Sequence, residues 1–172
     1  RARPGEVTLG NAGNALPSHS FFSLAKVKML TVPYKGAGPL MIDVMGGHVA
    51  LGMAAISSFM GTVRSGRAKA ICVCSLERTP LYPSAPALAQ DVPGFEAVAW
   101  FGMFLPRGAP ASLVKRIRDD VADVLKIPSV RDRLIELGGD PSGMPPEEFA
   151  RMVRSEIEKW NKVAASAGIK PQ

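Results

Sequence analysis

The sequence predicts an α/β fold in which helices cover a parallel β-sheet. In the first hundred residues, short β-type runs alternate with helical periods, and tight turns join them. Beyond about residue 105 the periodicity is helical only. Right-handed crossovers between parallel strands place every strand-to-helix turn along one sheet edge, where open α/β folds bind ligands.

The strands and helices of the first hundred residues are predicted from runs of β-forming residues and from glycine-containing turns that end the helices. A helix is closed wherever two turn-forming residues follow an apolar stretch, as at Gly46-Gly47 and Ser65-Gly66. The predicted strands are Glu6–Leu9, Leu30–Pro33, His48–Met53 and Lys69–Ser75. The predicted helices are Ser18–Lys26, Pro39–Met45 and Ala54–Arg64.

A change of composition near residue 98 predicts a domain boundary. Prolines punctuate residues 77–94, which leaves room for a short helix around Ala85–Gln90. Ala97–Leu105 is a near-continuous apolar run, which predicts a buried strand. We therefore expect two parts, residues 1–98 and 99–172.

The second part is predicted to hold three amphipathic helices. Apolar side chains recur at helical spacing, and Pro128 and Gly138-Gly139 mark the start and the end of the middle helix. We expect the apolar stripes to face a core. They comprise Leu113, Ile117, Val121 and Val124, then Val130, Leu134 and Leu137, then Phe149, Met152, Val153, Ile157, Trp160 and Val163.

The composition argues against several classes of protein. Apolar residues make up 47% of the chain and charged residues 21%, as in an ordinary globular domain. The net charge is +6, but the basic residues are dispersed and aromatics are only 6%, so nucleic-acid binding is not expected. No apolar run approaches the ~20 residues that span a bilayer. Cys72 and Cys74 lie two residues apart in a strand-like run, a spacing that suits neither a mutual disulfide nor a metal site. We expect both to be small side chains in the core.

Two strand-to-helix turns carry the strongest signal for ligand binding. The stretch from Tyr34 to Pro39 is a Gly-rich turn that feeds a helix, where outward-pointing N–H groups and the helix dipole favour an anion. The stretch from Asn11 to His19 offers short polar side chains and a glycine that allows close approach. A third turn begins at Ala54. All three belong to the same predicted edge.

No constellation for catalysis, metal binding or a cofactor is present in the sequence. Ser18 and His19 are adjacent on a predicted helix and cannot face each other, and His48 suits a turn. Phosphate-loop, dinucleotide and nucleophile-elbow motifs are missing, as are paired carboxylates in the loops. We expect no catalytic residue, no metal site and no cofactor.

The chain resembles the solute-binding proteins of tripartite tricarboxylate transporters, the Bug family. The resemblance covers essentially all 172 residues and rests on many short matches in order. They are Ala2–Gly5, Gly10–His19, Val32–Gly36, Gly46–Val49, Ser65–Ala70, Val92–Glu96, Trp100–Gly102, Leu137–Gly139 and Glu158–Trp160.

The resemblance implies a periplasmic-binding-protein type II-like fold that closes on a small carboxylate and delivers it to membrane transporter subunits. Residues 1–98 would form the second, ligand-binding lobe, which is complete. Residues 99–172 would form the returning C-terminal portion of the first lobe, so the chain resembles an N-terminally truncated member. The implied location is the periplasm, and catalysis and metals are not expected.

The resemblance also implies ligand contacts at the three turns. Hydroxyl residues usual in the family are replaced here by Asn11, Ala15 and Leu16. Ala54 stands where amino-acid-binding members have an aspartate, which implies a ligand without an ammonium group. The implied contact residues are Asn11, Ala12, Gly13, Asn14, Ser18, His19, Tyr34, Lys35, Gly36, Ala37, Gly38 and Ala54.

Both the local length of the chain and its function leave alternatives open. The chain looks a few residues shorter than the family between Phe22 and Val32, which a real deletion or an omitted loop would explain. A cytosolic effector-sensing domain has the same fold and would carry a DNA-binding helix-turn-helix upstream. An enzyme on this scaffold is a further alternative, and the last is a fragment that cannot close a cleft and binds no ligand.

Overall fold

A computed structural model describes residues 5–169, so the Ala2–Pro4 part of the first matching motif lies outside the described residues. The chain divides into two compact units. The first comprises Arg1–Ala99 together with Val163–Gln172, and the second comprises Trp100–Lys162. Each unit is described by itself below.

The first unit is built on a three-stranded parallel sheet. The strands are β1 (Thr8–Ala12), β2 (Leu30–Tyr34) and β3 (Leu51–Met53). Their order is β2-β1-β3, so β1 is central. The predicted parallel sheet is confirmed, although β1 begins and ends later than predicted and β3 is shorter. A short β3 leaves the β1 backbone before Leu9 unpaired on that side, where Thr8 Oγ1 instead accepts a hydrogen bond from Ala50 N–H at 2.8 Å.

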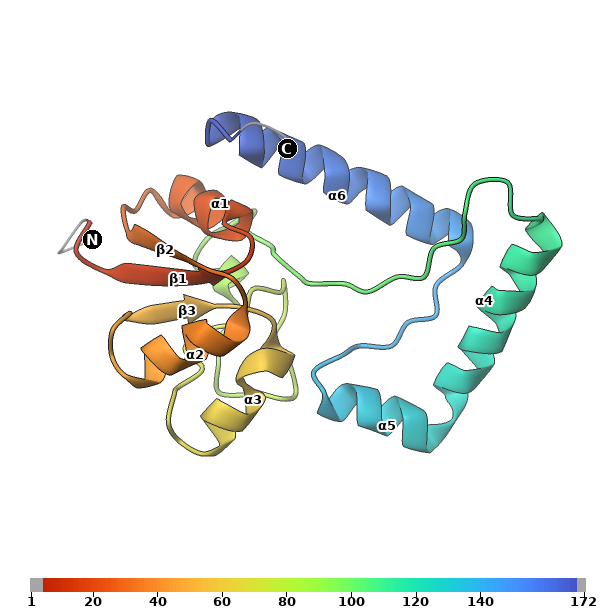
Figure 1. The fold of residues 1–172 in the computed structure, drawn as a ribbon, viewed down its shortest axis with the longest axis horizontal. Coiled ribbons are helices and arrows are strands. Elements are labelled where there is room, and N and C mark those ends of the chain that lie inside the picture. Colours follow the sequence, from red (N-terminus) through yellow and green to blue (C-terminus); the bar gives the residue numbers. More distant parts are fainter. Residues whose placement is uncertain (1–4, 170–172) are drawn as a thin grey trace. The chain divides into compact units, whose positions relative to one another are not determined.

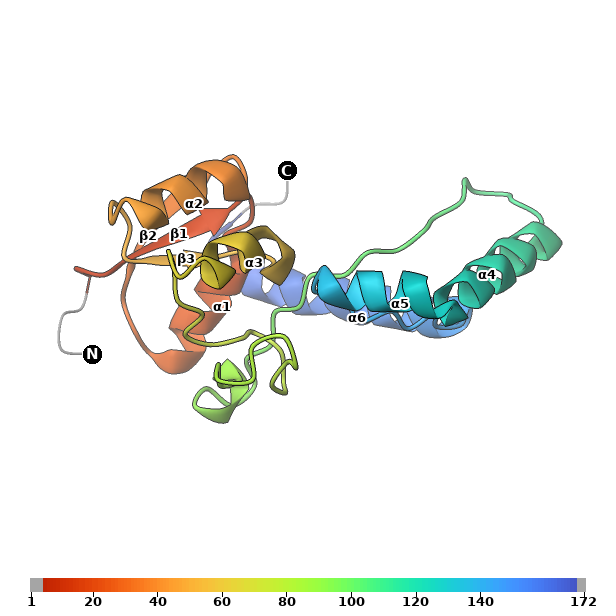
Figure 2. The same cartoon turned by 90° about the horizontal axis from the view of Figure 1, so that it is seen from below.

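Helices cover both faces of this sheet (Figures 1 and 2). Successive residues of β1 point to opposite faces, and Asn11 contacts α1 (Leu16–Ala25) on one of them. Gly10 faces α2 (Ala37–Met45) on the other, and α3 (Ile56–Arg64) packs beside α2. The predicted βαβ organisation is therefore correct up to α3.

Gly10 is required by the close packing of α2 on the sheet. A Cβ atom at this position would lie 2.3 Å from Leu40 Cδ1 and 2.9 Å from Tyr34 Cε2. The Leu40 side chain is completely buried. Because α2 lies this close, the start of the helix is held against the ends of β1 and β2.

The strand predicted at Lys69–Ser75 is wrong. Only a single parallel bridge forms there, between Val73 and Ala87. The partner segment contains Pro86, which has no N–H and cannot extend a ladder. Val73 and Ala87 form a small buried cluster with Ala85, and the helix predicted around Ala85–Gln90 is a 3-10 turn at Leu88–Gln90.

The second unit contains three helices near the predicted positions. They are α4 (Ala111–Lys126), α5 (Pro128–Glu136) and α6 (Pro146–Ser166), the last of which extends beyond the unit. The expectation that their stripes face a core is wrong for the described residues. No residue of α4, α5 or α6 is buried, and Leu113, Val124 and Ile157 are 42%, 47% and 55% exposed.

The buried strand predicted at Ala97–Leu105 is also wrong, since this stretch is neither a strand nor buried. Residues 98–105 run as an extended connection to α4, drawn in green in Figure 1. All six large apolar side chains of residues 98–105 are exposed, and Phe101 is 94% exposed. The described part of the second unit contains no β-strand, so the segment has no strand within that unit to pair with.

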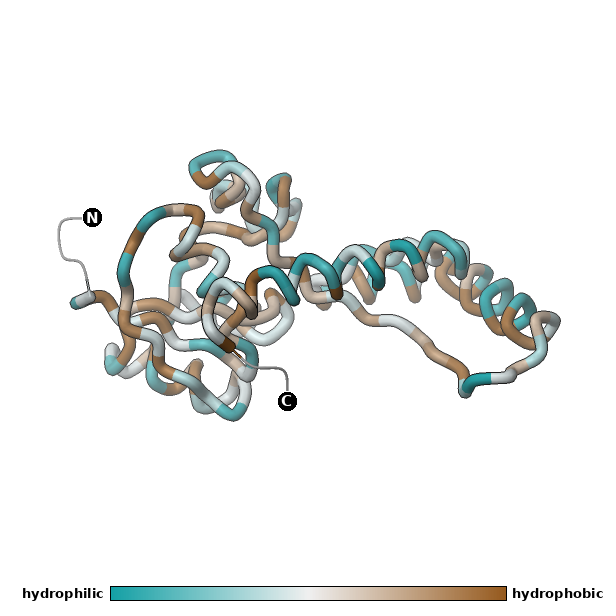
Figure 3. Tube along the Cα trace, turned by 90° about the horizontal axis from the view of Figure 1, so that it is seen from above, coloured by the Kyte–Doolittle hydropathy of each residue, from teal (hydrophilic) through white to brown (hydrophobic). Residues whose placement is uncertain are grey.

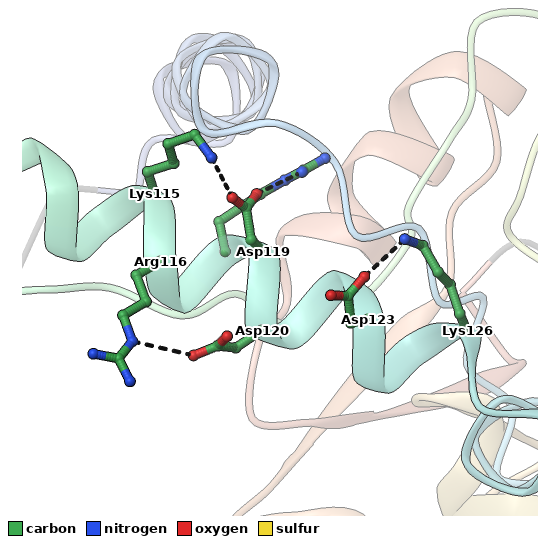
Figure 4. A network of polar contacts seen from close by, with 7 residues as sticks. Lys115, Arg116, Asp119, Asp120, Asp123 and Lys126 are labelled. Atoms are coloured by element: carbon green, nitrogen blue, oxygen red, sulfur yellow. Dashed lines mark hydrogen bonds and ion pairs between the residues drawn. The ribbon is translucent and has the colours of Figure 1, made fainter.

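Charged side chains of α4 pair with one another along the helix (Figure 4). Lys115 pairs with Asp119, and Arg116 with Asp120, each one turn apart. Lys126 pairs with Asp123 at 2.8 Å. Such exposed pairs contribute about 0.3–0.5 kcal/mol each, so they support the helix rather than form a ligand site.

Candidate functional site

The carboxyl ends of the three strands bring the three predicted turns to one edge of the sheet. Ala12 is the register partner of Tyr34, and Asn11 is the partner of Met53. The turns that follow these strands therefore start at the same level of the sheet. Each leads into a helix, α1, α2 or α3, whose N-terminus lies at this edge.

The first turn is tied to the second by a backbone hydrogen bond. Gly13 has φ 86° and donates its N–H to the Tyr34 carbonyl at 3.0 Å. The positive φ explains the glycine, because other residues rarely adopt it. Asn14 Oδ1 accepts a hydrogen bond from Leu16 N–H at 2.9 Å, so this side chain orders the start of α1.

Asn11 and Ser18 form a buried polar pair beneath the first turn. Ser18 Oγ donates to Asn11 Oδ1, and it lies 3.8 Å from Met53 Sδ on β3. Asn11 is 3% exposed and Ser18 is completely buried. Asn11 Nδ2 is buried without a hydrogen-bond partner among the described residues. These two side chains thus fix α1 to the sheet and leave one buried donor unused.

The second turn is positioned by a hydrogen bond within the unit. Tyr34 Oη donates to Asp43 Oδ2 of α2 at 2.6 Å. This bond, with burial and the nearby carboxylate charge adding to it, raises the pKa of Tyr34 above its ordinary value. Because the hydroxyl is occupied, Tyr34 orients the turn, and the Lys35 side chain that follows is exposed.

The N-terminus of α2 presents backbone donors and no side-chain acceptor. Gly36 occupies the N-cap position with φ 154°, and no side chain caps the helix. Ala37 and Gly38 form the first turn, and their N–H groups have no partner within the helix. Pro39 has no N–H, so the donors are confined to the residues around it.

The third turn also leads into a helix, α3, that begins without a side-chain cap. Ala54 is half-buried and Ala55 is the N-cap residue of α3, with φ −58° and ψ 141°. No side chain caps α3, and no acidic residue lies in its first turn. None of the three helices at this edge has an acidic residue in its first turn, and α2 and α3 also begin without a side-chain cap, whereas Asn14 bonds to the start of α1.

Absence of a cap is not unique to this edge, because α4 and α5 also begin without a side-chain cap. The distinguishing feature is convergence, since the starts of α2 and α3 lie beside the polar first turn at the ends of neighbouring parallel strands. By contrast, α6 begins with Glu147 and Glu148 in its first turn. A small anion at the sheet edge would find several backbone donors within one area.

Two residues that orient this edge were missed from the sequence. Gly10 allows α2 to approach, and Asp43 holds Tyr34. A glycine inside a strand-like run signals close backbone approach, so Gly10 could have been found. Asp43 gave no comparable signal, because its partner lies nine positions earlier in another element. His19, predicted as a contact, lies on α1 with its ring edge-on to Phe22 at 6.4 Å.

Features away from this edge do not compete with it as sites. A cavity of about 340 Å³ lies between α4, α5 and residues 141–143, and none of the predicted contact residues line it. Burial raises the pKa of the free Cys72 and Cys74 thiols, that of Cys74 to about 11. The described residues contain no cluster suited to a metal ion, and none of their helices has the length and apolarity to cross a membrane.

Comparison with known proteins identifies relatives along the whole chain. The UPF0065 protein in the tcbD-tcbE intergenic region of Pseudomonas sp. (strain P51) is 33% identical, over 95% of this chain and 50% of that protein. Protein BugT of Bordetella pertussis is 28% identical, over 99% of this chain and 54% of that protein. The chain thus spans about half the length of these relatives.

Two solved structures share the fold. R. palustris Rpa4515 with adipate is 31% identical and has a TM-score of 0.84, covering 100% of this chain and 59% of that one. MatC from Rhodopseudomonas palustris with bound malate is 29% identical, with a TM-score of 0.73, covering 92% of this chain and 57% of that one. The predicted periplasmic-binding-protein fold class is confirmed by such neighbours, and the chain covers less than two thirds of each of them.

The family described as the tripartite tricarboxylate transporter family receptor matches residues 1–169. That match covers nearly the entire chain, including the three turns at the sheet edge and all three helices of the second unit. The chain therefore belongs to the family of tripartite tricarboxylate transporter receptors.

Proposed function

We propose that this chain provides the carboxylate-binding turns of a periplasmic solute receptor. The observation that carries the proposal is the convergence of three strand-to-helix turns at the carboxyl edge of one parallel sheet, two of which lead into helices without a side-chain cap, α2 and α3. Each hydrogen bond from a backbone amide to a carboxylate contributes roughly 1.5–3 kcal/mol in a water-poor site. The relatives with adipate and with malate support a small carboxylate as the ligand.

The third turn favours a ligand without an amino group. Ala54 presents a methyl group, and an ammonium group bound there would lose water without gaining an anionic partner. Aspartate and succinate differ in this group alone. We therefore expect succinate to bind more tightly than aspartate.

The two parts have different roles in this proposal. Residues 1–98 form the ligand-binding lobe, and residues 99–172 belong to the other lobe of the receptor. The division of the chain into compact units near residue 99 supports the boundary, while Val163–Gln172 group with the first unit. Ligand would favour a closed arrangement of the lobes, which transporter subunits in the membrane would recognise. The receptor would bind its ligand without converting it.

Titration calorimetry with adipate, malate, succinate, aspartate and citrate tests the proposal. Binding of at least one carboxylate, with its diamide not binding, is the expected result. If none of the carboxylates binds the receptor at its natural length, the proposal fails. Turnover of a bound carboxylate would contradict the role as a receptor.

A charge placed at the third turn makes the test specific. Ala55→Asp puts a carboxylate at the N-cap of α3, in a backbone conformation that aspartate adopts readily. The cap should stabilise the protein by about 1 kcal/mol, yet it should weaken carboxylate binding at least tenfold by occupying the donors. Pro110→Asp is the matched control, because the N-cap of α4 has nearly the same dihedral angles, φ −57° and ψ 139°. It should leave carboxylate binding unchanged.

A further inference from the structure

The cavity within the second unit is lined by two arginines from different helices. Arg118 belongs to α4 and Arg131 to α5, and both line the cavity of about 340 Å³. Arg118 Nη2 lies 3.5 Å from the carbonyl oxygen of Gly143. Arg131 Nη1 lies 3.5 Å from the carbonyl oxygen of Pro141, in the same short loop. The two helices therefore bring two guanidinium groups to one cavity.

The Arg118 guanidinium has one edge without a firm hydrogen-bond acceptor. Its Nη1 pairs with Asp119 Oδ1 at 3.0 Å. Its Nη2 has only the Gly143 carbonyl at 3.5 Å, which is long for a hydrogen bond, and its Nε is buried without a partner among the described residues. Arginine binds a carboxylate or a phosphate with such an edge, through two parallel hydrogen bonds. An anion in the cavity would reach this edge by taking the place of the Gly143 carbonyl.

The charged residues that line the cavity are all basic. Lys126 is the third of them, and no acidic residue belongs to the lining that the described residues form. The Lys126 ammonium pairs with Asp123 at 2.8 Å, whereas no ion pair is recorded for Arg131 among the described residues. Like charges around one cavity disfavour one another, and an anion between them would replace this repulsion with attraction.

The rest of the lining is mostly apolar. Ala122 and Leu125 of α4 contribute to it together with Pro141. The loop packs against α4, because a Cβ atom at Gly143 would lie 3.4 Å from Leu125 Cδ1. Small-molecule sites commonly have volumes of roughly 300–1,000 Å³ and combine apolar walls with a few polar groups. The lining therefore suits an organic anion better than a bare inorganic ion.

We propose that the cavity between α4, α5 and residues 141–143 is a second anion site, which binds a small organic anion through Arg118 and Arg131. The carboxylate or phosphate group of the ligand would bridge the two guanidinium groups, and its apolar part would lie against Ala122 and Leu125. Binding would thus link α4 to α5. The cavity belongs to the second unit and does not replace the sheet edge of the first. The proposal does not rest on the carboxylate-binding turns, so either can fail alone.

Titration calorimetry of the full-length protein with benzoate and with phenyl phosphate tests the proposal. Inorganic phosphate is the probe without an apolar part. We expect at least one of the two organic anions to bind with a dissociation constant below ~1 mM, and the tighter of the two identifies the preferred anionic group. Inorganic phosphate should bind at least tenfold more weakly. Failure of both organic anions to bind, or equally tight binding of inorganic phosphate, would overturn the proposal.

Substitutions of the two arginines locate the bound anion. Arg131→Gln removes a charge from an exposed position, and Arg118→Lys keeps the charge but removes the planar fork. Each should weaken binding of the organic anion at least tenfold. Arg133→Gln is the matched control, because Arg133 is an exposed arginine of α5 that pairs with Glu136 and does not line the cavity. It should leave the affinity unchanged, and an equal loss in this control would overturn the proposal.

Ala55→Asp separates the cavity from the sheet edge. Ala55 lies in the first unit, so this substitution should not change the affinity of the cavity for the organic anion. An affinity that falls with Ala55→Asp and not with Arg131→Gln would place the anion at the sheet edge. That result would overturn the proposal of a second site and leave the proposed function in force.

Nitrogen-15 NMR of the arginine side chains gives a readout at the atom concerned. The Nε–H resonance of Arg118 should shift when the organic anion is added to the full-length protein, and that of Arg133 should stay in place. Calorimetric binding without a shift at Arg118 would overturn the proposal.

Discussion

The packing of α2 on β1 makes Gly10→Ala the most informative single substitution for the fold of the site. The added methyl carbon would lie 2.3 Å from Leu40 Cδ1, whereas carbon atoms in contact are about 3.5–4.0 Å apart. Leu40 is completely buried, so any movement of its side chain disturbs other buried groups. Relief therefore requires the Leu40 and Tyr34 side chains, or α2 itself, to shift.

The expected cost follows from two opposing effects. Overpacking of this kind destabilises by about 1–3 kcal/mol, and the severe overlap at Leu40 places Gly10→Ala at the upper end. Replacing glycine also restricts the unfolded chain, which returns about 0.4–1 kcal/mol. The net loss should be about 1–2 kcal/mol, measured by urea unfolding followed by far-ultraviolet circular dichroism.

Gly61→Ala provides a control of opposite sign. Gly61 lies inside α3, and a Cβ atom there would meet nothing within 4 Å. This substitution should stabilise by about 0.5–1 kcal/mol through helix propensity. The double variant Gly10→Ala with Leu40→Ala should lose at least 1 kcal/mol less than the sum of the single losses, because the second change creates the missing space. If Gly10→Ala stabilises as Gly61→Ala does, α2 does not pack as described.

Further predictions concern three single residues, Lys26, Ala54 and Cys74. Lys26 adopts φ 52° and ψ 47° at the end of α1, so Lys26→Gly should stabilise by about 0.5–1 kcal/mol in urea unfolding, and a loss would contradict the left-handed conformation. Ala54→Asp should raise the ratio of aspartate to succinate affinity about tenfold in calorimetry, and an unchanged ratio would remove the third turn from the site. The pKa of Cys74 is raised to about 11 from 9.0, so iodoacetamide should modify it about a hundredfold more slowly at pH 8 than a free cysteine. Since folding raises this pKa, the Cys74 contribution to stability should be complete below pH 9 and lost between pH 9 and 11, a slope that Cys74→Ser should reduce.

The strand-to-helix turns could be predicted from the sequence because their signals are local. The Gly36-Ala37-Gly38 run, together with the residues before and after it, fixes where β2 ends and α2 begins. In the same way, Asn11 and Gly13 mark the end of β1. Parallel pairing then follows from the short crossovers, without knowledge of any particular contact.

Contacts between distant residues could not be predicted in this way. The bond between Tyr34 and Asp43 depends on how α2 rotates about its axis, which the helical period does not determine. The isolated bridge at Val73 depends on a partner segment fourteen residues later, whose proline prevents a ladder. The role of Asn11 depends on Ser18 arriving beneath it on α1.

The run from Ala97 to Leu105 shows most clearly what a sequence pattern establishes. An unbroken apolar run predicts burial, because exposed Phe, Met and Trp side chains leave apolar surface in water, but the run does not identify what covers it. Within the described residues, α6 covers one face through Phe149, and nothing covers Phe101 on the other. The apolar pattern therefore predicts which side chains favour burial, and only the fold shows which of them have a covering layer.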